Sequence, residues 1–145
     1  MTAIDAMAVM YADLLNELIS NIQKDEPIQT YEQNENDASY SLWRNEDDYL
    51  IDWNQDAVFI KRFIDAVGNP YKGACFHYNG KRISIVDAEI FRDVKIVNRD
   101  TGKVLTKNIN NPVVVCGTGL LEIKKMLDED NNEFILDSLR VRLNK

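Results

Sequence analysis

The stretch "AVGNPYKGACFHYNGKRISIVDAEI", which runs from Ala66 to Ile90, decides how this 145-residue chain folds. It follows a segment whose apolar residues recur every three or four positions, and Gly68 and Pro70 are residues that end such a helix. After this break the apolar residues alternate with polar ones, and Asn79-Gly80 is the dipeptide typical of a tight hairpin turn. The stretch therefore predicts a helix that leads directly into an antiparallel sheet.

The remainder of the chain reads as further short strands separated by turns. Apolar runs begin at Val104 and continue as "PVVVCG", "GLLEIKKML" and "FILDSLRVRL". Gly117-Thr118-Gly119 predicts a tight turn between two of these runs, and a change of apolar phase near Asp87 predicts a bulge or bend. Because no helical pattern interrupts the five or six expected strands, a small antiparallel barrel is favoured over a parallel α/β sheet.

Two helices are expected before the sheet. Residues 4–23 carry an apolar stripe with spacings of three and four, which must bury against something, and Pro27 ends that helix. In front of the second helix, Asp52 or Asn54 is expected to provide the N-terminal cap, with Asp56 in the first turn. The expected fold class is α+β, with two helices and a long loop that lead into a small antiparallel OB-like barrel.

The segment between the two helices is polar and acidic, yet it is rich in aromatic residues. The aromatic residues of positions 25–50 are Tyr31, Tyr40, Trp43 and Tyr49. A disordered linker would have few aromatic residues. Aromatic side chains can pin a loop to a surface, or they can line a binding cleft. Composition alone leaves both interpretations open.

Composition also bears on location and on metal binding. The apolar fraction of 45% is enough for a core, and no apolar run reaches the roughly 18–20 residues that span a bilayer. The N-terminus lacks the pattern of an export signal, so a cytoplasmic location without membrane association is expected. Cys75 and Cys116 lie in apolar runs, which favours buried free thiols. His77 is the only histidine and no Cys-x-x-Cys spacing occurs, so no metal site is expected.

The charge is distributed unevenly along the chain. The net charge is −7, and residues 1–50 hold eleven Asp and Glu against two Lys and Arg. A protein that binds nucleic acid by neutralising phosphates usually has a basic face and a high pI. The pI near 4.7 therefore argues against nucleic-acid binding, although it leaves room for a local basic patch.

No set of residues has the spacing of a catalytic site. Gly117-Thr118-Gly119 lacks the Gly-Lys-Ser/Thr of a phosphate-binding loop, and it opens a strand instead of a helix. His77 has no Ser or Cys nucleophile at a recognisable spacing. We therefore predict no catalytic residue in this chain.

A set of short motifs follows the order that one known family shows. The residues that carry it are Gln33, Tyr40, Arg44, Asp48, Ile51-Asp52-Trp53, the helix from Ile60 to Ala66, and Pro70-Tyr71-Lys72-Gly73-Ala74. This order resembles the C-terminal region of the formyltransferases that use 10-formyltetrahydrofolate as donor. The family includes methionyl-tRNA formyltransferase and the nucleotide-sugar N-formyltransferases. The resemblance covers nearly the whole chain, and "IDW" followed by "NPYKGA" and the "NGKRISI" hairpin is its most specific part.

The resemblance implies an OB-like C-terminal barrel for residues 73–145 and a loop with a linker helix for residues 29–72. Residues 1–28 would be the last helix of an N-terminal catalytic domain, which holds the family's catalytic residues and the 10-formyltetrahydrofolate. That domain would be the partner of this chain, which by itself would bind no cofactor and catalyse no formyl transfer. The resemblance to the sugar formyltransferases, which pair through their C-terminal regions, also implies a homodimer.

Within the family, the acidic balance, the Asn69-Pro70-Tyr71 turn and the "SYSLWR" segment resemble the nucleotide-sugar branch, whose acceptor is a nucleotide-linked amino sugar. Arg44 would then pair with a diphosphate oxygen. Tyr40, Trp43 or Tyr71 would stack on a pyrimidine base. The alternative for each of these residues is packing between the loop and the barrel. The alternatives for the whole region are a tRNA-binding domain of a methionyl-tRNA formyltransferase and a non-catalytic assembly module.

Overall fold

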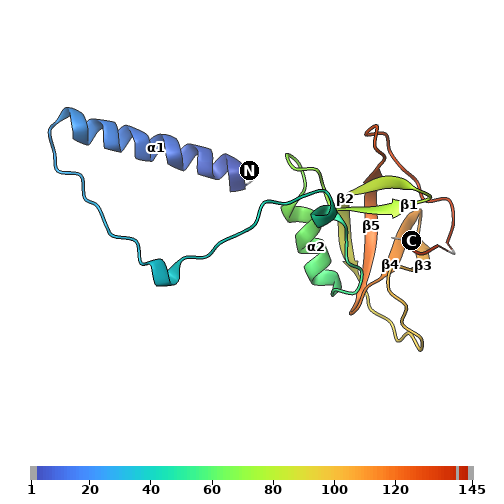
Figure 1. Ribbon diagram of the computed structural model, residues 1–145. Helices are drawn as coiled ribbons and strands as arrows, with labels where there is room; N and C mark the ends of the chain where they lie inside the picture. The colour runs from blue at the N-terminus through green and yellow to red at the C-terminus, as the bar shows by residue number, and fades with distance from the viewer. Residues whose placement is uncertain (1–2, 140, 144–145) are drawn as a thin grey trace. The chain divides into compact units, whose positions relative to one another are not determined.

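The computed structural model describes residues 3–139 and 141–143, and the chain forms two compact units, Met1–Ser41 and Leu42–Lys145. The first unit contains helix α1 (Ala3–Gln23) and a short 3-10 turn at Glu35–Asp37 (Figure 1). The second unit contains the remaining elements: a 3-10 turn at Asp47–Tyr49, helix α2 (Ala57–Ala66), and strands β1 (Cys75–Tyr78), β2 (Lys81–Phe91), β3 (Val104–Asn108), β4 (Asn111–Val115) and β5 (Leu120–Leu127). Both predicted helices are confirmed.

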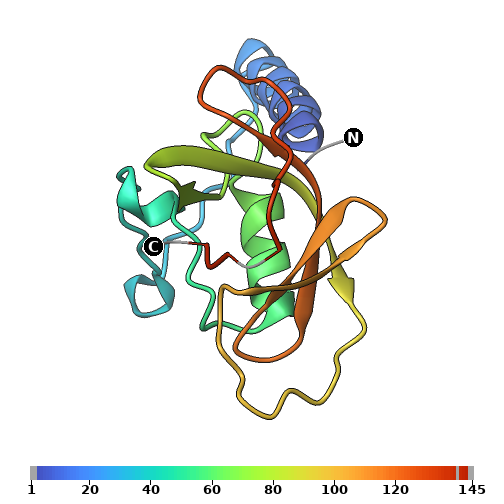
Figure 2. The ribbon, with the colours of Figure 1, turned by 90° about the vertical axis from the view of Figure 1, so that its right-hand side faces the viewer.

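The strands form one sheet with the order β1-β2-β5-β4-β3, and every neighbouring pair is antiparallel. Figure 2 shows how strongly this sheet curls. Helix α2 packs against β2 and β5. The predicted α+β class with a small antiparallel barrel-like sheet is therefore confirmed, with five strands among the described residues.

The hairpin between β1 and β2 forms where the sequence predicts it. Asn79 and Gly80 have φ angles of 50° and 76°, so both central residues of the turn are left-handed, as a type I′ turn requires. Tyr78 pairs with Lys81 on either side of the turn. The predicted bulge near Asp87 is also confirmed, because the register between β2 and β5 shifts on both sides of that residue.

The turn between β4 and β5 anchors the backbone that leads into α2. The Gly117 N–H donates to the carbonyl oxygens of Trp53 and Gln55, at 2.9 Å each. The Ala57 N–H, at the start of α2, donates to the Thr118 carbonyl at 2.9 Å. A Cβ atom on Gly117 would lie 1.9 Å from the carbonyl oxygen of Asn54, so only glycine permits this close approach. The Gly-Thr-Gly sequence is thus a packing device as well as a turn.

The N-terminal cap of α2 is Asp56, so the prediction of Asp52 or Asn54 is wrong. The Asp56 carboxylate accepts a hydrogen bond from the Phe59 N–H at 2.7 Å, the contact that defines a cap. Asp52 instead accepts hydrogen bonds from the Asn54 N–H at 3.0 Å and the Gln55 amide at 3.2 Å. Asp52 therefore stabilises the turn that precedes the helix, and the helix itself begins at Ala57.

The predicted last strand, "FILDSLRVRL", is also wrong. Its described residues, 134–139 and 141–143, contain only an isolated bridge, and they connect the two edge strands of the sheet. At the β1 edge, the Tyr78 hydroxyl donates to the Asp137 carboxylate at 2.8 Å. At the β3 edge, the Lys107 ammonium donates to the Leu136 carbonyl at 2.6 Å. Because the segment crosses between edges instead of running along one of them, it cannot form a continuous ladder.

The main core lies between α2 and the sheet. Trp53 is 4% exposed and meets Phe76 edge to face with ring centroids 6.5 Å apart. Both cysteines are buried free thiols, which confirms that prediction. The apolar stripe of α1 is exposed, as shown by Met7, Met10, Leu14 and Ile22. Among the described residues, no helix is both long enough and apolar enough to cross a membrane.

Candidate functional site

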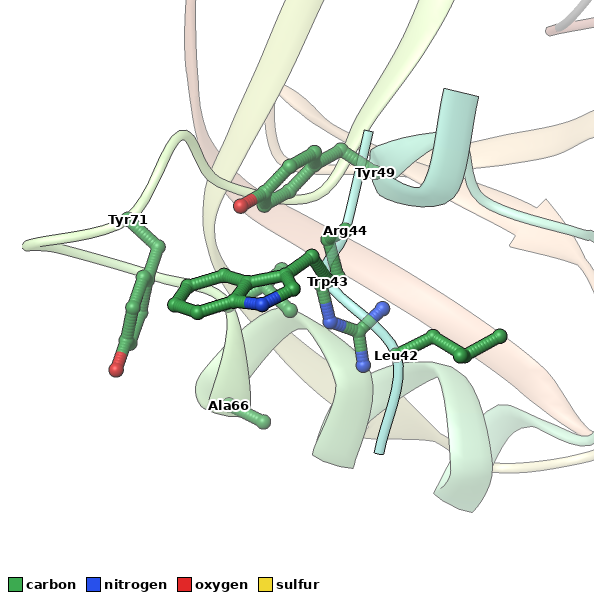
Figure 3. Close-up of a pocket in the computed structure, with 7 residues that line it drawn as sticks. Leu42, Trp43, Arg44, Tyr49, Ala66 and Tyr71 are labelled. Carbon is green, nitrogen blue, oxygen red and sulfur yellow. The ribbon is translucent and has the colours of Figure 1, made fainter. Parts of the chain in front are cut away.

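A hollow of about 370 Å³ lies in the second unit, where the loop before α2 meets the end of that helix. Its walls come from three places in the chain: the loop at 42–49, the last residues of α2, and the turn that follows α2. The residues that line it are Leu42, Trp43, Arg44, Tyr49, Ala66, Val67 and Tyr71. Figure 3 shows the indole of Trp43 extending toward the ring of Tyr71.

Three of the four residues predicted for ligand contact line this pocket. Trp43, Arg44 and Tyr71 come together although 28 positions separate the first from the last. Tyr40 belongs to the first unit, is 87% exposed, and is not among the lining residues. Tyr49 lines the pocket but was expected only as one of the loop aromatics. Its position beside "IDW" is the signal that could have identified it.

The aromatic residues of the loop divide between the two roles that composition left open. Tyr49 is buried, and the Tyr49 carbonyl accepts a hydrogen bond from the Cys75 thiol at 3.4 Å. Tyr49 therefore pins the end of the loop to the barrel. Trp43 is 99% exposed, which is incompatible with the alternative of packing between loop and barrel. The loop is consequently fixed at one end and presents an aromatic side chain to solvent near that end.

Arg44 is positioned by contacts with both the loop and the helix. Its guanidinium carbon lies 5.5 Å from the centre of the Phe63 ring on α2, within the range of a cation–π contact. The guanidinium also donates to the Asp48 carbonyl at 3.3 Å. The Asp48 carboxylate in turn accepts the Asn45 N–H at 2.7 Å, which closes the loop into a tight turn. These contacts use few of the five N–H donors of Arg44, so the others can bind an anion.

An ion pair connects the two sides of the pocket. The Lys72 ammonium, directly after Tyr71, pairs with the Glu46 carboxylate, three residues after Trp43. The hydrogen bond from Lys72 holds the pKa of Glu46 below its ordinary value of 4.5. The Gly73 N–H donates to the Val67 carbonyl at 2.9 Å, which fixes the turn that carries Tyr71 and Lys72. The pocket therefore combines rings that can stack with a guanidinium that can pair with an anion.

The described residues that line the pocket include neither cysteine nor histidine. Among residues 3–139 and 141–143, no group of three or more His, Cys, Asp and Glu could hold a metal ion. The Cys116 thiol is buried, and burial raises its pKa to about 12. The lining residues of the pocket suit it for binding.

Comparison with known proteins places the chain in a family. Two methionyl-tRNA formyltransferases are similar: that of Rickettsia bellii is 30% identical over 125 residues, and that of Rickettsia prowazekii is 33% identical over 119 residues. These matches cover 86% and 81% of this chain, but only 38% and 36% of the relatives, so the chain spans little more than a third of their length.

A solved structure has a similar fold. The structure of a HypX variant from Aquifex aeolicus matches with a TM-score of 0.58 and 18% sequence identity, over 86% of this chain and 21% of that chain. The sequence model described as "Formyl transferase, C-terminal domain" matches residues 44–138, which is more than half of the chain and includes most of the pocket. The resemblance noted from the motifs is therefore confirmed: the chain belongs to the family of formyl transferase C-terminal domains.

Proposed function

We propose that this chain is the C-terminal domain of a methionyl-tRNA formyltransferase and that it contributes to binding of the tRNA acceptor. The observation that carries the proposal is the similarity to proteins named methionyl-tRNA formyltransferase along most of the chain. In this proposal the formyl group comes from 10-formyltetrahydrofolate. A separate catalytic domain of the same enzyme binds that donor and carries the reacting groups.

The named relatives favour the tRNA acceptor over the nucleotide-sugar acceptor that the sequence motifs were taken to indicate. The charge distribution is compatible with this change. Residues 1–41 hold eight Asp and Glu against one Lys, whereas residues 42–145 hold sixteen Asp and Glu against sixteen Lys and Arg. The acidity that argued against RNA therefore lies in the first unit, and the unit with the pocket is neutral overall.

Helix α1 supplies a surface for the proposed partner domain. Its apolar side chains, among them Met7, Met10 and Leu14, are about half exposed or more. A stripe of this width is typical of a helix that covers an apolar surface of a folded domain. We therefore propose the catalytic domain of the same enzyme as the surface that α1 covers.

The proposal is tested by comparing two acceptors on the same chain. Purified 145-residue protein is titrated with initiator tRNA and with a nucleotide-linked amino sugar, and binding is followed by fluorescence anisotropy at several salt concentrations. We expect tRNA to bind with an affinity that falls as salt rises, since phosphate contacts release counterions, and to bind much more tightly than the sugar. Binding of the sugar without tRNA would contradict the proposal and restore the nucleotide-sugar interpretation.

A second measurement tests the assignment in an active enzyme. Residues 42–145 replace the corresponding domain of the Rickettsia bellii relative, and formylation of methionyl-tRNA is compared with that of the same enzyme lacking any C-terminal domain. We expect the chimaera to be more active than the truncated enzyme. Equal activity of the two would show that this domain adds nothing to tRNA use.

A further inference from the structure

We propose that the pocket between residues 42 and 71 takes one unstacked base of a single-stranded RNA, which stacks between Trp43 and Tyr71, with a phosphate on Arg44. We propose further that the Glu46–Lys72 ion pair sets the separation of these two aromatic walls. The inference rests on the proposed function, because it identifies the part of an RNA acceptor that this domain binds.

The exposure of Trp43 is the first argument. Its indole is 99% exposed, so it contributes almost nothing to the core, and the adjacent Leu42 is 94% exposed as well. Large apolar side chains that gather on a surface mark a site of interaction. An exposed aromatic ring is the feature on which proteins stack the bases of single-stranded nucleic acids.

The opposite wall and the size of the pocket are the second argument. Tyr71 is 58% exposed and faces the same hollow as Trp43. The hollow of about 370 Å³ is in the size range of sites for small ligands. Figure 3 shows the Trp43 indole reaching toward the Tyr71 ring. In this proposal a planar base enters between the two rings, whereas a base inside a duplex already stacks on its neighbours and is not free to enter.

Arg44 supplies the charge that a nucleotide needs. A guanidinium matches the geometry of a phosphate and binds two of its oxygens at once. The cation–π contact with Phe63 and the hydrogen bond to the Asp48 carbonyl hold the side chain against α2, so little conformational freedom remains to be lost on binding. A single arginine predicts one phosphate contact and therefore a shallow salt dependence for this pocket.

The Glu46–Lys72 ion pair connects the loop that carries Trp43 with the turn that carries Tyr71. Lys72 follows Tyr71 directly, and Glu46 lies three residues after Trp43. Both side chains are more than half exposed, at 57% and 66%, so the pair contributes little to the stability of the fold. Its effect is instead to restrain the loop that carries Trp43 relative to the turn that carries Tyr71. Without it the two rings would be held less rigidly for stacking.

The two tryptophans of the chain allow a direct experiment. Trp53 is 4% exposed and Trp43 is 99% exposed, so quenching of tryptophan fluorescence by a ligand reports on Trp43. The 145-residue protein is titrated with a single-stranded trinucleotide RNA, a blunt RNA duplex and UDP-glucose. We expect strong quenching by the trinucleotide, weaker quenching by UDP-glucose, which offers the pocket a single base and its phosphates, and none by the duplex. Quenching by the duplex to the same extent, or by UDP-glucose in place of the trinucleotide, would overturn the proposal.

Variants test each part of the pocket, with affinity measured by anisotropy of a labelled trinucleotide. Trp43→Ala is expected to weaken binding about 10-fold, the size of one lost stacking contact. Arg44→Gln is expected to lower the slope of log affinity against log salt by about 0.7, which corresponds to one phosphate. Circular dichroism of each variant checks that these substitutions at exposed positions leave the fold intact. Unchanged affinity in Trp43→Ala would refute base stacking.

The ion pair is tested against a matched control elsewhere in the same unit. Glu46→Gln is expected to weaken trinucleotide binding about 3-fold with little change in stability. Asp65→Asn removes a different ion pair, that of half-buried Lys61 with exposed Asp65, which does not line the pocket. It should leave the affinity unchanged. Equal effects of the two substitutions would show that the Glu46–Lys72 pair has no special role.

The outcomes separate this inference from the proposed function. If initiator tRNA binds the chain but the trinucleotide leaves Trp43 fluorescence unchanged, only the inference about the pocket fails. If neither RNA binds, the proposed function fails and the inference fails with it.

Discussion

Replacing Gly117 by alanine should destabilise the barrel far more than the addition of one methyl group suggests. The new Cβ would lie 1.9 Å from the Asn54 carbonyl oxygen, 2.8 Å from the Asn54 carbonyl carbon and 3.1 Å from the Gln55 carbonyl oxygen. All three are backbone atoms, so no side-chain rotation relieves the overlap. The φ angle of Gly117 is not left-handed, so the effect comes from the clash and not from the conformation of residue 117.

The size of the loss in stability follows from the contacts that the backbone loses when it makes room for the methyl group. To accommodate the methyl group, residues 53–55 have to move away from the turn by more than an ångström. That movement breaks the two hydrogen bonds from the Gly117 N–H to the carbonyls of Trp53 and Gln55, at about 1 kcal/mol each. It also displaces Trp53 from the core, and such overpacking costs about 1–3 kcal/mol. We expect a loss of about 3–5 kcal/mol, a large part of the stability of a domain of this size.

Urea unfolding followed by far-ultraviolet circular dichroism measures the effect. Gly80→Ala is the matched control, because Gly80 is left-handed with φ of 76° and has open space around its Cβ position. That control should cost only about 1 kcal/mol for the unfavourable backbone conformation. A Gly117→Ala variant that is no less stable than Gly80→Ala would refute the argument, since it would mean that the 53–55 backbone moves freely.

Three further predictions concern the cap, the C-terminal segment and the thiols. Asp56→Ala should lower the free energy of unfolding by about 1 kcal/mol, because it removes the cap on the Phe59 N–H, and Asp56→Asn, measured in the same urea titration, should retain most of it. The hydrogen bond to Asp137 raises the pKa of Tyr78 above its ordinary value of 10.0, so the stability from this contact is present below pH 10 and is lost as the pH rises through the raised pKa. The stability difference between wild type and Tyr78→Phe should therefore shrink above pH 10, and a difference that grows there would contradict the assignment. Burial raises the pKa of Cys116 to about 12, so roughly one thiolate in ten thousand is present at pH 8, and a thiol reagent should react at that site only after unfolding by urea; rapid reaction of the native protein would show that the site is open.

The local features of the fold could be predicted because they depend on neighbours in sequence. Asn79-Gly80 forms its hairpin since both residues tolerate left-handed backbone, whatever surrounds them. The C-terminal segment could not be predicted in the same way. Its residues are apolar enough for a strand, but Asp137 and Leu136 are held by Tyr78 and Lys107, which lie on strands 59 and 29 positions earlier. Such contacts depend on which edges of the sheet remain open.

The prediction of the N-terminal cap of α2 failed for a related reason. Asp52, Asn54 and Asp56 are all good capping residues, and the sequence alone does not distinguish them. The choice is made by the β4–β5 turn, where Gly117 and Thr118 bind the backbone at Trp53, Gln55 and Ala57 and so fix where the helix can begin. A long-range contact therefore decides a local boundary.

The same distinction explains why Trp43 and Trp53 differ so much, although only ten positions separate them. Trp53 is carried into the core because its own carbonyl accepts the Gly117 N–H and the Ile51 N–H, two residues earlier, donates to Cys75. Tyr49 is the buried residue at the end of the loop, and its carbonyl accepts a hydrogen bond from the Cys75 thiol. Trp43 lies six residues before it, and its indole remains exposed. The stretch from Ala66 to Ile90 then completes the pocket, because the turn that ends α2 places Tyr71 at the edge of the hollow that Trp43 lines. The scaffold thus fixes one wall of the pocket, and the ion pair of Glu46 with Lys72 restrains the other, which is why we expect its loss to change binding more than folding.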